Sequence, residues 1–429
     1  MNMVIVFIHQ NFPAQYLHIV RCLAAQPENQ IYFITQANHS ELPGVRKLVY
    51  QPQLPMVFSC HTYTASFDVA VRTATAVADV CRQLREQGVV PDIIVGHCGW
   101  GETMFVKEIF PDVPLLSYFE FFYYPEGADV GFDPEFAPRT DGDVARLQVR
   151  NTVNRLSFAH SDWGHTATSW QRSLFPVEMQ ARITSLHEGV DTGRVRPDSS
   201  AWIKLARENI LLTHDDEIIT YVSRNLEPYR GFHIFMRSLP EMLRRHPRAH
   251  ALIVGGDGMS YSDPPPSGTT YREMLLAEVG SSLDMDRVHF LGQVPYETYV
   301  NVLQVSSAHI HLTYPFVLSW SFLEAMAAGC LIIGSATAPV LEVLRDKKNG
   351  LAVDFFSTDE ICSRVDEVLD HPNRMQALRD AARATALKHF DLKTVTLPRW
   401  NRLLRELVTR RFPLQQPPDH GLAMQTNQR

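Results

Sequence analysis

The chain has 429 residues, of which 45% are hydrophobic and 20% are charged. This length exceeds one ordinary domain, and the composition is typical of a folded globular protein, which excludes a disordered, collagen-like or coiled-coil chain. The formal net charge is −7, from 40 Lys and Arg residues against 47 Asp and Glu residues. Because no broad basic field is available to bind phosphates, we expect no nucleic-acid partner.

The six cysteines include no CxxC pair, so we expect neither a disulfide framework nor a zinc site. The chain starts without a basic segment, and its first apolar run of about five residues suits a buried strand better than a signal peptide. No stretch approaches the roughly 20 apolar residues that span a bilayer. These features predict a cytoplasmic protein.

Apolar runs typical of buried strands alternate with stretches of helical spacing. In the first half, strands are expected at residues 3–8, 30–35, 91–96 and 113–119, and helices at about 15–25 and 67–86. The alternation resumes after residue 215, with strands expected at 217–223, 249–256, 287–292, 308–313, 330–335 and 350–355. This pattern predicts parallel sheets covered by helices on both faces.

Two α/β domains follow, each an open, doubly wound, Rossmann-like parallel sheet. The boundary is expected in the Gly-, Pro- and Asp-containing segment 189–200, which gives domains at 1–195 and 205–390. The tail 413–429 is rich in Pro, Gln and Asn and is expected to be disordered. Ligands of such sheets bind beyond the carboxyl ends of the strands, so the expected site is a cleft between the domains.

The segment YVSRNLEPYRGF combines a strand end with two cations and a helix start. Arg224 follows the strand, and Arg230 precedes Gly231, which opens a helix. Two guanidinium groups beside a helix N-terminus suit a diphosphate, because both supply N–H donors to phosphate oxygens. The alternative is a solvated loop with two surface arginines.

Two glutamates and a glycine turn mark the later strand ends. Glu324 lies in an otherwise apolar helix at about 319–328, where an ionised carboxylate needs a partner such as a ribose diol. Its alternative is a place on an exposed helix face. Glu342 could cap a ligand or only its own short helix, and Gly256 lies in a glycine turn that lets a ligand approach the backbone.

Taken in order, these segments resemble glycosyltransferase family 4, also called group 1, which has the two-domain GT-B fold. The resemblance covers nearly the whole chain and is strongest over residues 218–353. Its carriers are Arg224 with Arg230 and Gly231, the turn of Gly256 and Gly258, the LEAMAxG element at 323–329, the turn at 339–343 and the hinge-like segment 187–197.

The resemblance implies a glycosyltransferase that moves a sugar from a nucleoside-diphosphate donor, UDP- or GDP-linked, with retention at the anomeric carbon. Neither a metal nor another cofactor is implied. Arg224 and Arg230 would bind the donor diphosphate and stabilise its charge in catalysis. Glu324 would bind the ribose, Glu342 would lie near the diphosphate and the sugar, and the base would pack beside Val294.

One departure concerns the donor sugar. The family often has two glutamates eight residues apart, but Phe316 stands eight residues before Glu324. Leu318, Ser319 and Trp320 could still present backbone N–H groups to the sugar. An inactive sugar-nucleotide-binding homologue or partner subunit is therefore the alternative function. A third alternative is a nucleotide-sugar epimerase or a phosphorylase of related architecture. The phosphorylase is disfavoured, because no lysine lies in a suitable glycine-rich context for pyridoxal phosphate.

The N-terminal half matches the family less closely. Its first loop, which contains His9 and Ala14, lacks the usual glycines, and Glu120 stands where the family places a histidine. We expect Glu120 to be catalytic, with a pKa that burial would raise, or else to be a salt-bridged loop residue. His9, Ala14, His97 and Glu102 are assigned to the acceptor side, for an acceptor that could be a glycan, a lipid-linked molecule or a small molecule.

Two further segments have competing interpretations. Residues 397–412 form a basic amphipathic stretch that suits either a helix on a membrane surface or, by the resemblance, a C-terminal helix at 391–412 that crosses back to the N-terminal domain. Peripheral membrane contact is therefore kept as an expectation. Asp141, in the DGD segment, is expected to cap a helix of residues 141–159 rather than bind a metal.

Overall fold

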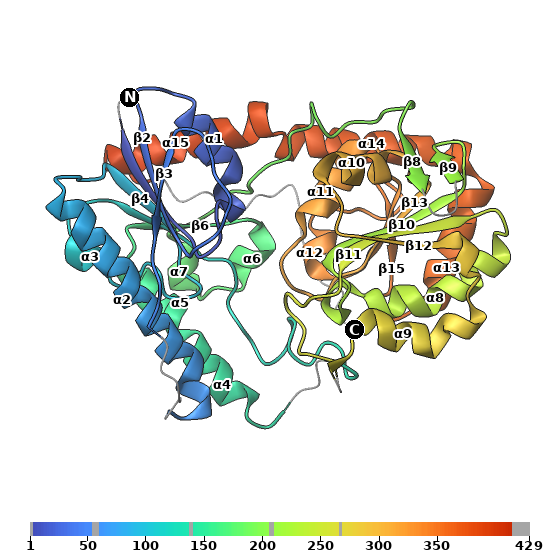
Figure 1. Ribbon diagram of the computed structural model, residues 1–429, viewed down its shortest axis with the longest axis horizontal. Helices are drawn as coiled ribbons and strands as arrows, with labels where there is room; N and C mark the ends of the chain where they lie inside the picture. The colour runs from blue at the N-terminus through green and yellow to red at the C-terminus, as the bar shows by residue number, and fades with distance from the viewer. Residues whose placement is uncertain (1–2, 54–59, 137–139, 206–209, 266–267, 414–429) are drawn as a thin grey trace. The chain divides into compact units, whose positions relative to one another are not determined.

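The computed structural model describes residues 3–53, 60–136, 140–205, 210–265 and 268–413 (Figure 1). The chain divides into two compact units. The first comprises Met1–Glu126, Arg139–Gly189 and Leu392–Arg429, and the second comprises Gly127–Pro138 and Val190–Asp391. The tail that was expected to be disordered lies, apart from Pro413, outside the described residues.

The first unit is built on a parallel sheet in the order β3-β2-β1-β4-β5-β6-β7. The central strand β1 is almost wholly apolar, which suits a strand covered on both faces. The strand bounds are Val4–Ile8 (β1), Gln30–Thr35 (β2), Val45–Val49 (β3), Ile93–His97 (β4), Leu115–Tyr118 (β5), Trp163–Thr166 (β6) and Ile183–Ser185 (β7).

Helices cover both faces of this sheet (Figure 1). On one face lie α1 (Leu17–Ala24) and α15 (Leu397–Val408), and on the other lie α2 (Ala65–Glu86) and α3 (Val106–Ile109). The remaining helices of the unit are α4 (Asp143–Arg150), α5 (Thr152–His160), α6 (Ser169–Ser173) and α7 (Val177–Gln180), with short turns at Ala14–Tyr16 (η1), Thr62–Thr64 (η2) and Leu392–Thr396 (η7).

The apolar side of α15 is buried in the first unit. Trp400, Leu403, Leu404 and Leu407 join the same core as α1, and the ring centroids of Trp400 and His165 lie 4.7 Å apart. This side is therefore not exposed for insertion into a membrane surface. Within the described ranges no helix is long and apolar enough to cross a membrane.

The prediction of one helix over residues 141–159 is wrong in detail. The segment 141–159 forms two helices, α4 and α5, and the N-cap of α4 is Gly142 rather than Asp141. Asp143 takes the stabilising role, since its Oδ2 accepts from the N–H of Thr140 at 2.7 Å and its Oδ1 binds Arg146 at 2.6 Å. A first-turn carboxylate in this position stabilises the N-terminus of α4.

The second unit is built on a parallel sheet in the order β12-β11-β10-β13-β14-β15. Its strands lie where continuous apolar runs predicted them. Their bounds are Ile218–Asn225 (β10), His250–Gly256 (β11), Val288–Gly292 (β12), Ala308–His311 (β13), Ile332–Ser335 (β14) and Leu351–Val353 (β15). A separate antiparallel pair, β8 (Trp202–Leu205) and β9 (Ile210–Thr213), was not expected.

Two apolar cores lie on the two faces of this sheet. One contains residues of α8 (Phe232–Arg245), α9 (Tyr271–Val279) and α13 (Thr358–Asp370), and the other contains residues of α10 (Tyr296–Gln304), α11 (Trp320–Ala328) and α14 (Pro372–Phe390). Shorter helices are η3 (Pro228–Arg230), η5 (Gly280–Ser282), η6 (Met285–Arg287) and α12 (Ala338–Leu341). The units thus have the doubly wound α/β architecture that the sequence predicted.

Residues 127–136 belong to the second unit, although the elements before and after them in the sequence, β5 and α4, belong to the first. We name this segment the strap. It has no regular secondary structure.

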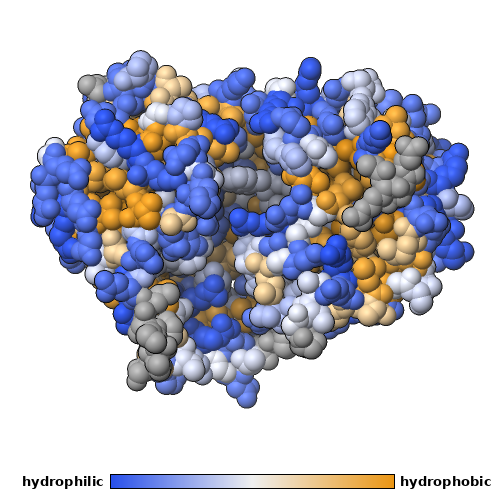
Figure 2. Space-filling view, viewed as in Figure 1, coloured by the Kyte–Doolittle hydropathy of each residue, from blue (hydrophilic) through white to orange (hydrophobic). Residues whose placement is uncertain are grey.

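The outer surface in Figure 2 is largely hydrophilic at its edges, with hydrophobic residues showing in separate patches.

Candidate functional site

Arg230 is a buried cation beyond the carboxyl end of β10 in the second sheet. It is buried in η3, directly after β10, and its Nη1 donates to Thr313 Oγ1 at 2.8 Å and to the Val317 carbonyl at 3.0 Å. Its guanidinium lies 5.2 Å from the ring centroid of Tyr261. Because only one nitrogen makes these bonds, the other N–H groups remain able to bind an anion.

Arg224 lies nearby in sequence but in a different environment. It is the next-to-last residue of β10, and its side chain is exposed. The alternative of two surface arginines in a solvated loop is therefore wrong for Arg230, which is buried, and Arg224 is exposed but lies in a strand. An exposed arginine without packing costs more conformational entropy when it is ordered by a ligand.

Gly231 lets α8 begin next to Arg230. Its φ is +68°, and a Cβ at this position would lie 2.3 Å from the Cβ of Leu312, so any other residue would clash with backbone-anchored atoms. The N-terminus of a 14-residue helix is thereby placed directly after the buried guanidinium. Helix dipole and cation together favour an anionic ligand here.

Glu227 is a buried residue of this loop that the sequence analysis did not select. Its Oε2 accepts from three successive backbone N–H groups, those of Ser260, Tyr261 and Ser262, at 3.0 to 3.1 Å. Only 1% of the residue is exposed. The carboxylate therefore fixes the loop after β11 and places Tyr261 beside Arg230. The sequence carries no signal for this role, because the three N–H groups lie 33 to 35 residues away in the chain.

The glycine turn brings three loops close together. A Cβ at Gly256 would lie 2.8 Å from Gln293 Nε2 and 2.9 Å from Asn225 Oδ1, which are residues that end or follow neighbouring strands. Val294 packs against the core on the α10 and α11 side of the sheet. The space that a Cβ at Gly256 would need is taken by these two side-chain ends, and the approach of a ligand to this turn stays a prediction.

The Glu324 carboxylate is half-buried and already has two donors. Tyr296 donates to Oε1 at 2.6 Å and Tyr299 donates to Oε2 at 2.7 Å. Burial raises its pKa, and the two tyrosine hydrogen bonds oppose that shift. The exposed-face alternative is therefore wrong. Each carboxylate oxygen retains a lone pair, so two further hydroxyl donors can still be accommodated.

Phe316 fills the position of the missing glutamate with an aromatic contact. It is 5% exposed, and its ring centroid lies 5.6 Å from that of Tyr229 and 5.0 Å from that of Tyr261. Of the three residues expected to present backbone donors, Leu318 is buried, Ser319 is the N-cap of α11, and Trp320 begins the helix. Glu342, half-buried, is the C-cap residue of α12.

The Ser319 side chain leaves the start of α11 uncapped. Its hydroxyl pairs with that of Ser321 at 2.8 Å and makes no cap bond to the helix. In the first turn, the N–H of Phe322 donates to the Ser319 carbonyl at 3.1 Å. The expectation that this segment presents backbone donors to a sugar stays a prediction.

In the first unit, Glu120 lies just beyond β5 with two side chains near its carboxylate. Gln15 Nε2 donates to Oε1 at 3.2 Å, and His97 Nε2 lies 3.5 Å from Oε2. Gln171 fixes the backbone of Glu120 by donating to its carbonyl at 2.7 Å. The side chain is 24% exposed, so Glu120 is neither fully buried nor a free loop residue.

The Nε2 of His97 faces the Glu120 carboxylate. Its Nδ1 accepts from the N–H of Gly99 at 3.0 Å. Its ring stacks on Trp100, with centroids 4.2 Å apart. The His9 ring lies 4.9 Å from that of His97, and burial, followed by repulsion from His97, lowers the pKa of His9 well below its ordinary value.

Glu102 is fully buried beneath this group. Its Oε2 accepts from the N–H of Trp100 at 3.2 Å. Burial raises its pKa to about 7, although His97 and backbone N–H groups oppose the shift.

Ala14, with φ +46°, lies in η1 directly before Gln15, the residue that donates to Glu120. The structure thus gathers His9, His97, Glu102 and Glu120 at one edge of the sheet.

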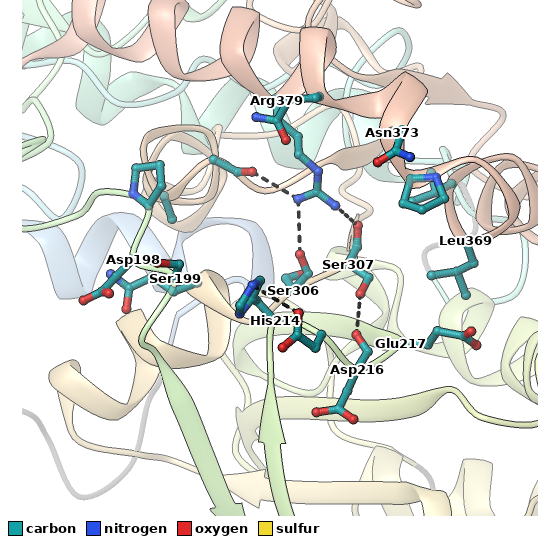
Figure 3. Close-up of a pocket in the computed structure, with 18 of the residues that line it drawn as sticks. Asp198, Ser199, His214, Asp216, Glu217, Ser306, Ser307, Leu369, Asn373 and Arg379 are labelled. Carbon is teal, nitrogen blue, oxygen red and sulfur yellow. Dashed lines mark hydrogen bonds and ion pairs between the residues drawn. The ribbon is translucent and has the colours of Figure 1, made fainter.

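A surface pocket of about 710 Å³ lies at the opposite edge of the second sheet (Figure 3). Its lining includes Glu217 and Ser307, which precede the amino ends of β10 and β13. Arg379, its most buried cation, donates to the carbonyls of Ser306, Ser307 and Gly329. These bonds occupy both terminal nitrogens of the Arg379 guanidinium, whereas the bonds of Arg230 involve only one nitrogen.

No group of three His, Cys, Asp or Glu residues in the described part of the chain is arranged to hold a metal ion.

Two family models match the chain. The model of the glycosyl transferase family 4 group matches residues 27–195, and that of the glycosyl transferases group 1 matches residues 203–385. The chain therefore belongs to the family 4, group 1 glycosyltransferases.

Curated relatives align with part of their length. The D-inositol 3-phosphate glycosyltransferase of Rhodococcus jostii is 27% identical over 244 residues, which are 56% of this chain and 51% of the relative. The GDP-mannose-dependent alpha-(1-6)-phosphatidylinositol monomannoside mannosyltransferase of Mycolicibacterium smegmatis is 29% identical over 265 residues, 58% of this chain and 63% of the relative. The chain thus spans about half to three fifths of these relatives.

Solved structures share the fold over nearly the whole chain. The structure of sucrose-phosphate synthase from Thermosynechococcus elongatus has a TM-score of 0.71 at 18% sequence identity. The superposition covers 95% of this chain and 100% of the synthase chain. Anabaena HepE, solved in complex with UDP and glucose, has a TM-score of 0.65 at 16% identity and covers 94% and 100%. These similarities establish the GT-B fold for this chain.

Proposed function

We propose that the chain transfers a hexose from a nucleoside-diphosphate sugar to an acceptor hydroxyl, with retention at the anomeric carbon and without a metal. The observation that carries this proposal is Arg230, a buried guanidinium fixed by Thr313 and Val317 at the start of α8. A fixed cation and a helix N-terminus can stabilise the charge that develops on a departing diphosphate.

The donor half of the site would lie in the second unit. Arg230 would bind the diphosphate with help from Arg224, and Glu324 would accept from ribose hydroxyls at the lone pairs that its two tyrosines leave open. The names of the relatives support either base: one is called GDP-mannose-dependent, and HepE was solved with UDP. We therefore propose a UDP- or GDP-linked donor.

The acceptor half would lie in the first unit, around Glu120, His97 and Trp100. The hydrogen-bond and ion-pair partners of these three groups in the described part of the chain include no lysine or arginine. Such surroundings favour hydroxyl groups over phosphate groups, and the indole face adds an apolar platform. Glu120 would contact the reacting sugar or the acceptor hydroxyl. The relatives that act on inositol phosphates or phosphatidylinositol leave peripheral membrane contact as part of this proposal.

Turnover of the purified chain tests this function. UDP-glucose and GDP-mannose, each with and without simple sugar acceptors, should show transfer or slow donor hydrolysis, which persists when EDTA is added. The anomeric configuration of any product, read by NMR, tests retention. Calorimetric titration with UDP and GDP tests donor binding separately.

The second function is a nucleotide-sugar-binding homologue without activity, and Phe316 is the observation that favours it. Tight UDP or GDP binding without hydrolysis or transfer would support that alternative and contradict the enzyme.

A further inference from the structure

The strap is attached to the second unit by aromatic and acidic side chains. The Phe132 ring centroid lies 5.1 Å from that of Tyr314 and 5.2 Å from that of Phe355. The Phe136 ring lies 4.9 Å from that of His233. Because the strap has no regular secondary structure, these side chains and its carboxylates determine where it lies.

Asp133 is the most buried of these carboxylates, with 1% of the residue exposed. Tyr314 donates to its Oδ2, the His233 ring nitrogen lies 3.1 Å from the same oxygen, and the N–H of Glu135 donates to Oδ1 at 2.9 Å. Burial acts to raise its pKa, but the His233 and Tyr314 hydrogen bonds prevail and lower it to about 2. The carboxylate is therefore ionised at neutral pH.

Asp129 makes a second contact of the same kind. It is 3% exposed, and its Oδ2 accepts from the hydroxyl of Tyr229 at 2.9 Å. Tyr229 in turn packs against Tyr314, with ring centroids 4.6 Å apart, and its carbonyl accepts from the Tyr314 N–H at 3.0 Å. The two aspartates thus bind the same small group of rings.

That group of rings surrounds the residues that fix Arg230. Tyr229 immediately precedes Arg230, and Tyr314 immediately follows Thr313, whose hydroxyl accepts from the Arg230 guanidinium. His233 lies in the first turn of α8, two residues after Gly231. The strap carboxylates therefore bind Tyr229, which precedes Arg230, Tyr314, which follows one of its hydrogen-bond partners, and His233 in the helix that begins beside it.

We propose that Asp129 and Asp133 are positioning residues of the donor site, which act on Arg230 through Tyr229, Tyr314 and His233. The inference rests on the proposed donor site, and it adds a third element to that site, contributed by a segment whose neighbours in sequence belong to the first unit. Burying two carboxylates costs free energy that simple attachment of a loop does not require, since apolar contacts such as Phe132 would suffice.

The strap supplies its own control. Glu135 forms a bidentate ion pair with Arg237 at 2.7 Å for both bonds, on a more exposed part of α8. Glu135→Gln should loosen the same segment without changing the hydrogen bonds of Tyr229, Tyr314 or His233. A role limited to attaching the strap would therefore give the same result for all strap variants.

The experiment titrates UDP and GDP into the full-length parent, Asp129→Asn, Asp133→Asn, Tyr314→Phe and Glu135→Gln, at a temperature where circular dichroism shows each protein folded. We expect the first three variants to bind the nucleotide that the parent prefers more weakly, on the order of tenfold, and Glu135→Gln to bind within about twofold of the parent. Asp129→Asn and Tyr314→Phe keep the test available if Asp133→Asn does not fold.

The outcomes separate the two proposals. If the parent binds neither UDP nor GDP, the proposed function fails. If the parent binds one of them and Asp129→Asn and Tyr314→Phe bind it as well as Glu135→Gln does, the positioning role is overturned while the donor site stands.

Discussion

At the residue scale, the two arginines of the proposed donor site differ. Arg230 is fixed by hydrogen bonds to Thr313 and Val317, whereas the side chain of Arg224 is exposed. We expect Arg230→Ala to weaken nucleoside-diphosphate binding by about 1.5–3 kcal/mol, because a charge-assisted bond is lost from a preorganised group. Arg224→Ala should cost less, since its side chain is exposed in the free protein. Isothermal titration with UDP and GDP measures both. Unchanged affinity in both variants would remove these residues from the site.

The Glu324 carboxylate accepts hydrogen bonds from two tyrosines, and under the proposed function it also accepts hydrogen bonds from the nucleotide. We expect Glu324→Gln to lower nucleotide affinity, because an amide offers only one acceptor oxygen where the carboxylate offers two. Tyr296→Phe, which removes one internal donor, is the matched control and should reduce affinity less. A lower melting temperature for Glu324→Gln with unchanged nucleotide affinity would make Glu324 a purely structural residue.

Glu102 predicts a pH dependence of stability with a defined sign. Because burial raises its pKa to about 7 from an ordinary 4.5, the folded chain binds this proton more tightly than the unfolded chain. The stabilisation is full below about pH 4.5 and is lost as the pH rises through 7, a change on the order of 3 kcal/mol.

Urea unfolding at pH 5 and pH 7.5 measures this effect. Glu102→Gln should reduce the loss of stability between the two pH values relative to the parent, and comparison with the parent cancels the contribution of buried histidines such as His9. An identical pH dependence in parent and variant would mean that Glu102 keeps an ordinary pKa.

At the element scale, α15 completes the core of the first unit. Trp400 is 2% exposed and packs against Tyr16 and His165. We expect Trp400→Ala to destabilise the first unit by about 3–5 kcal/mol, because a large buried ring is replaced by a cavity. Thermal unfolding followed by tryptophan fluorescence and circular dichroism measures the loss. Arg402→Ala, on the exposed side of α15, should have little effect and serves as the control.

Elements whose residues are uniformly apolar could be predicted from the sequence, and elements of mixed character could not. The runs at β1, β10 and β11 are apolar because both faces of each strand are covered. By contrast, the edge strand β3 reads VRKLV, and β6 reads WGHT, so neither carries a continuous apolar signal.

The site shows a similar division. Arg230 and Gly231 could be predicted because a strand end, a cation and a helix start are neighbours in the sequence. Glu227 and the strap could not, because their roles depend on partners 33 to 35 and 100 to 181 residues away in the chain. Phe316 marked a departure from the family pattern, but only the structure shows the two tyrosine rings that pack against it.

At the scale of the whole molecule, the chain passes between its units at residues 126–127, 138–139, 189–190 and 391–392. Each unit has its own chemistry at the carboxyl edge of its sheet: cations and backbone donors in the second, and carboxylates, imidazoles and an indole in the first. Under the proposed function, the second unit would bind the leaving nucleotide and the first would contact the reacting sugar or the acceptor. Variants of the two units should therefore change different kinetic quantities.

A variant of Glu120 should change turnover without changing nucleotide affinity. We expect Glu120→Gln to lower kcat by about 100-fold or more while affinity for UDP or GDP stays within about twofold, because an interaction made to the reacting groups is felt in the transition state. The variant keeps the size of the side chain and an oxygen that can accept from Gln15. Turnover and nucleotide titration on one preparation measure the two quantities together, with Gln15→Ala as a control that removes only the neighbouring amide. Equal turnover in Glu120→Gln and the parent would make Glu120 a bystander in the first unit, whereas a parallel loss of nucleotide affinity would place it in the donor site instead.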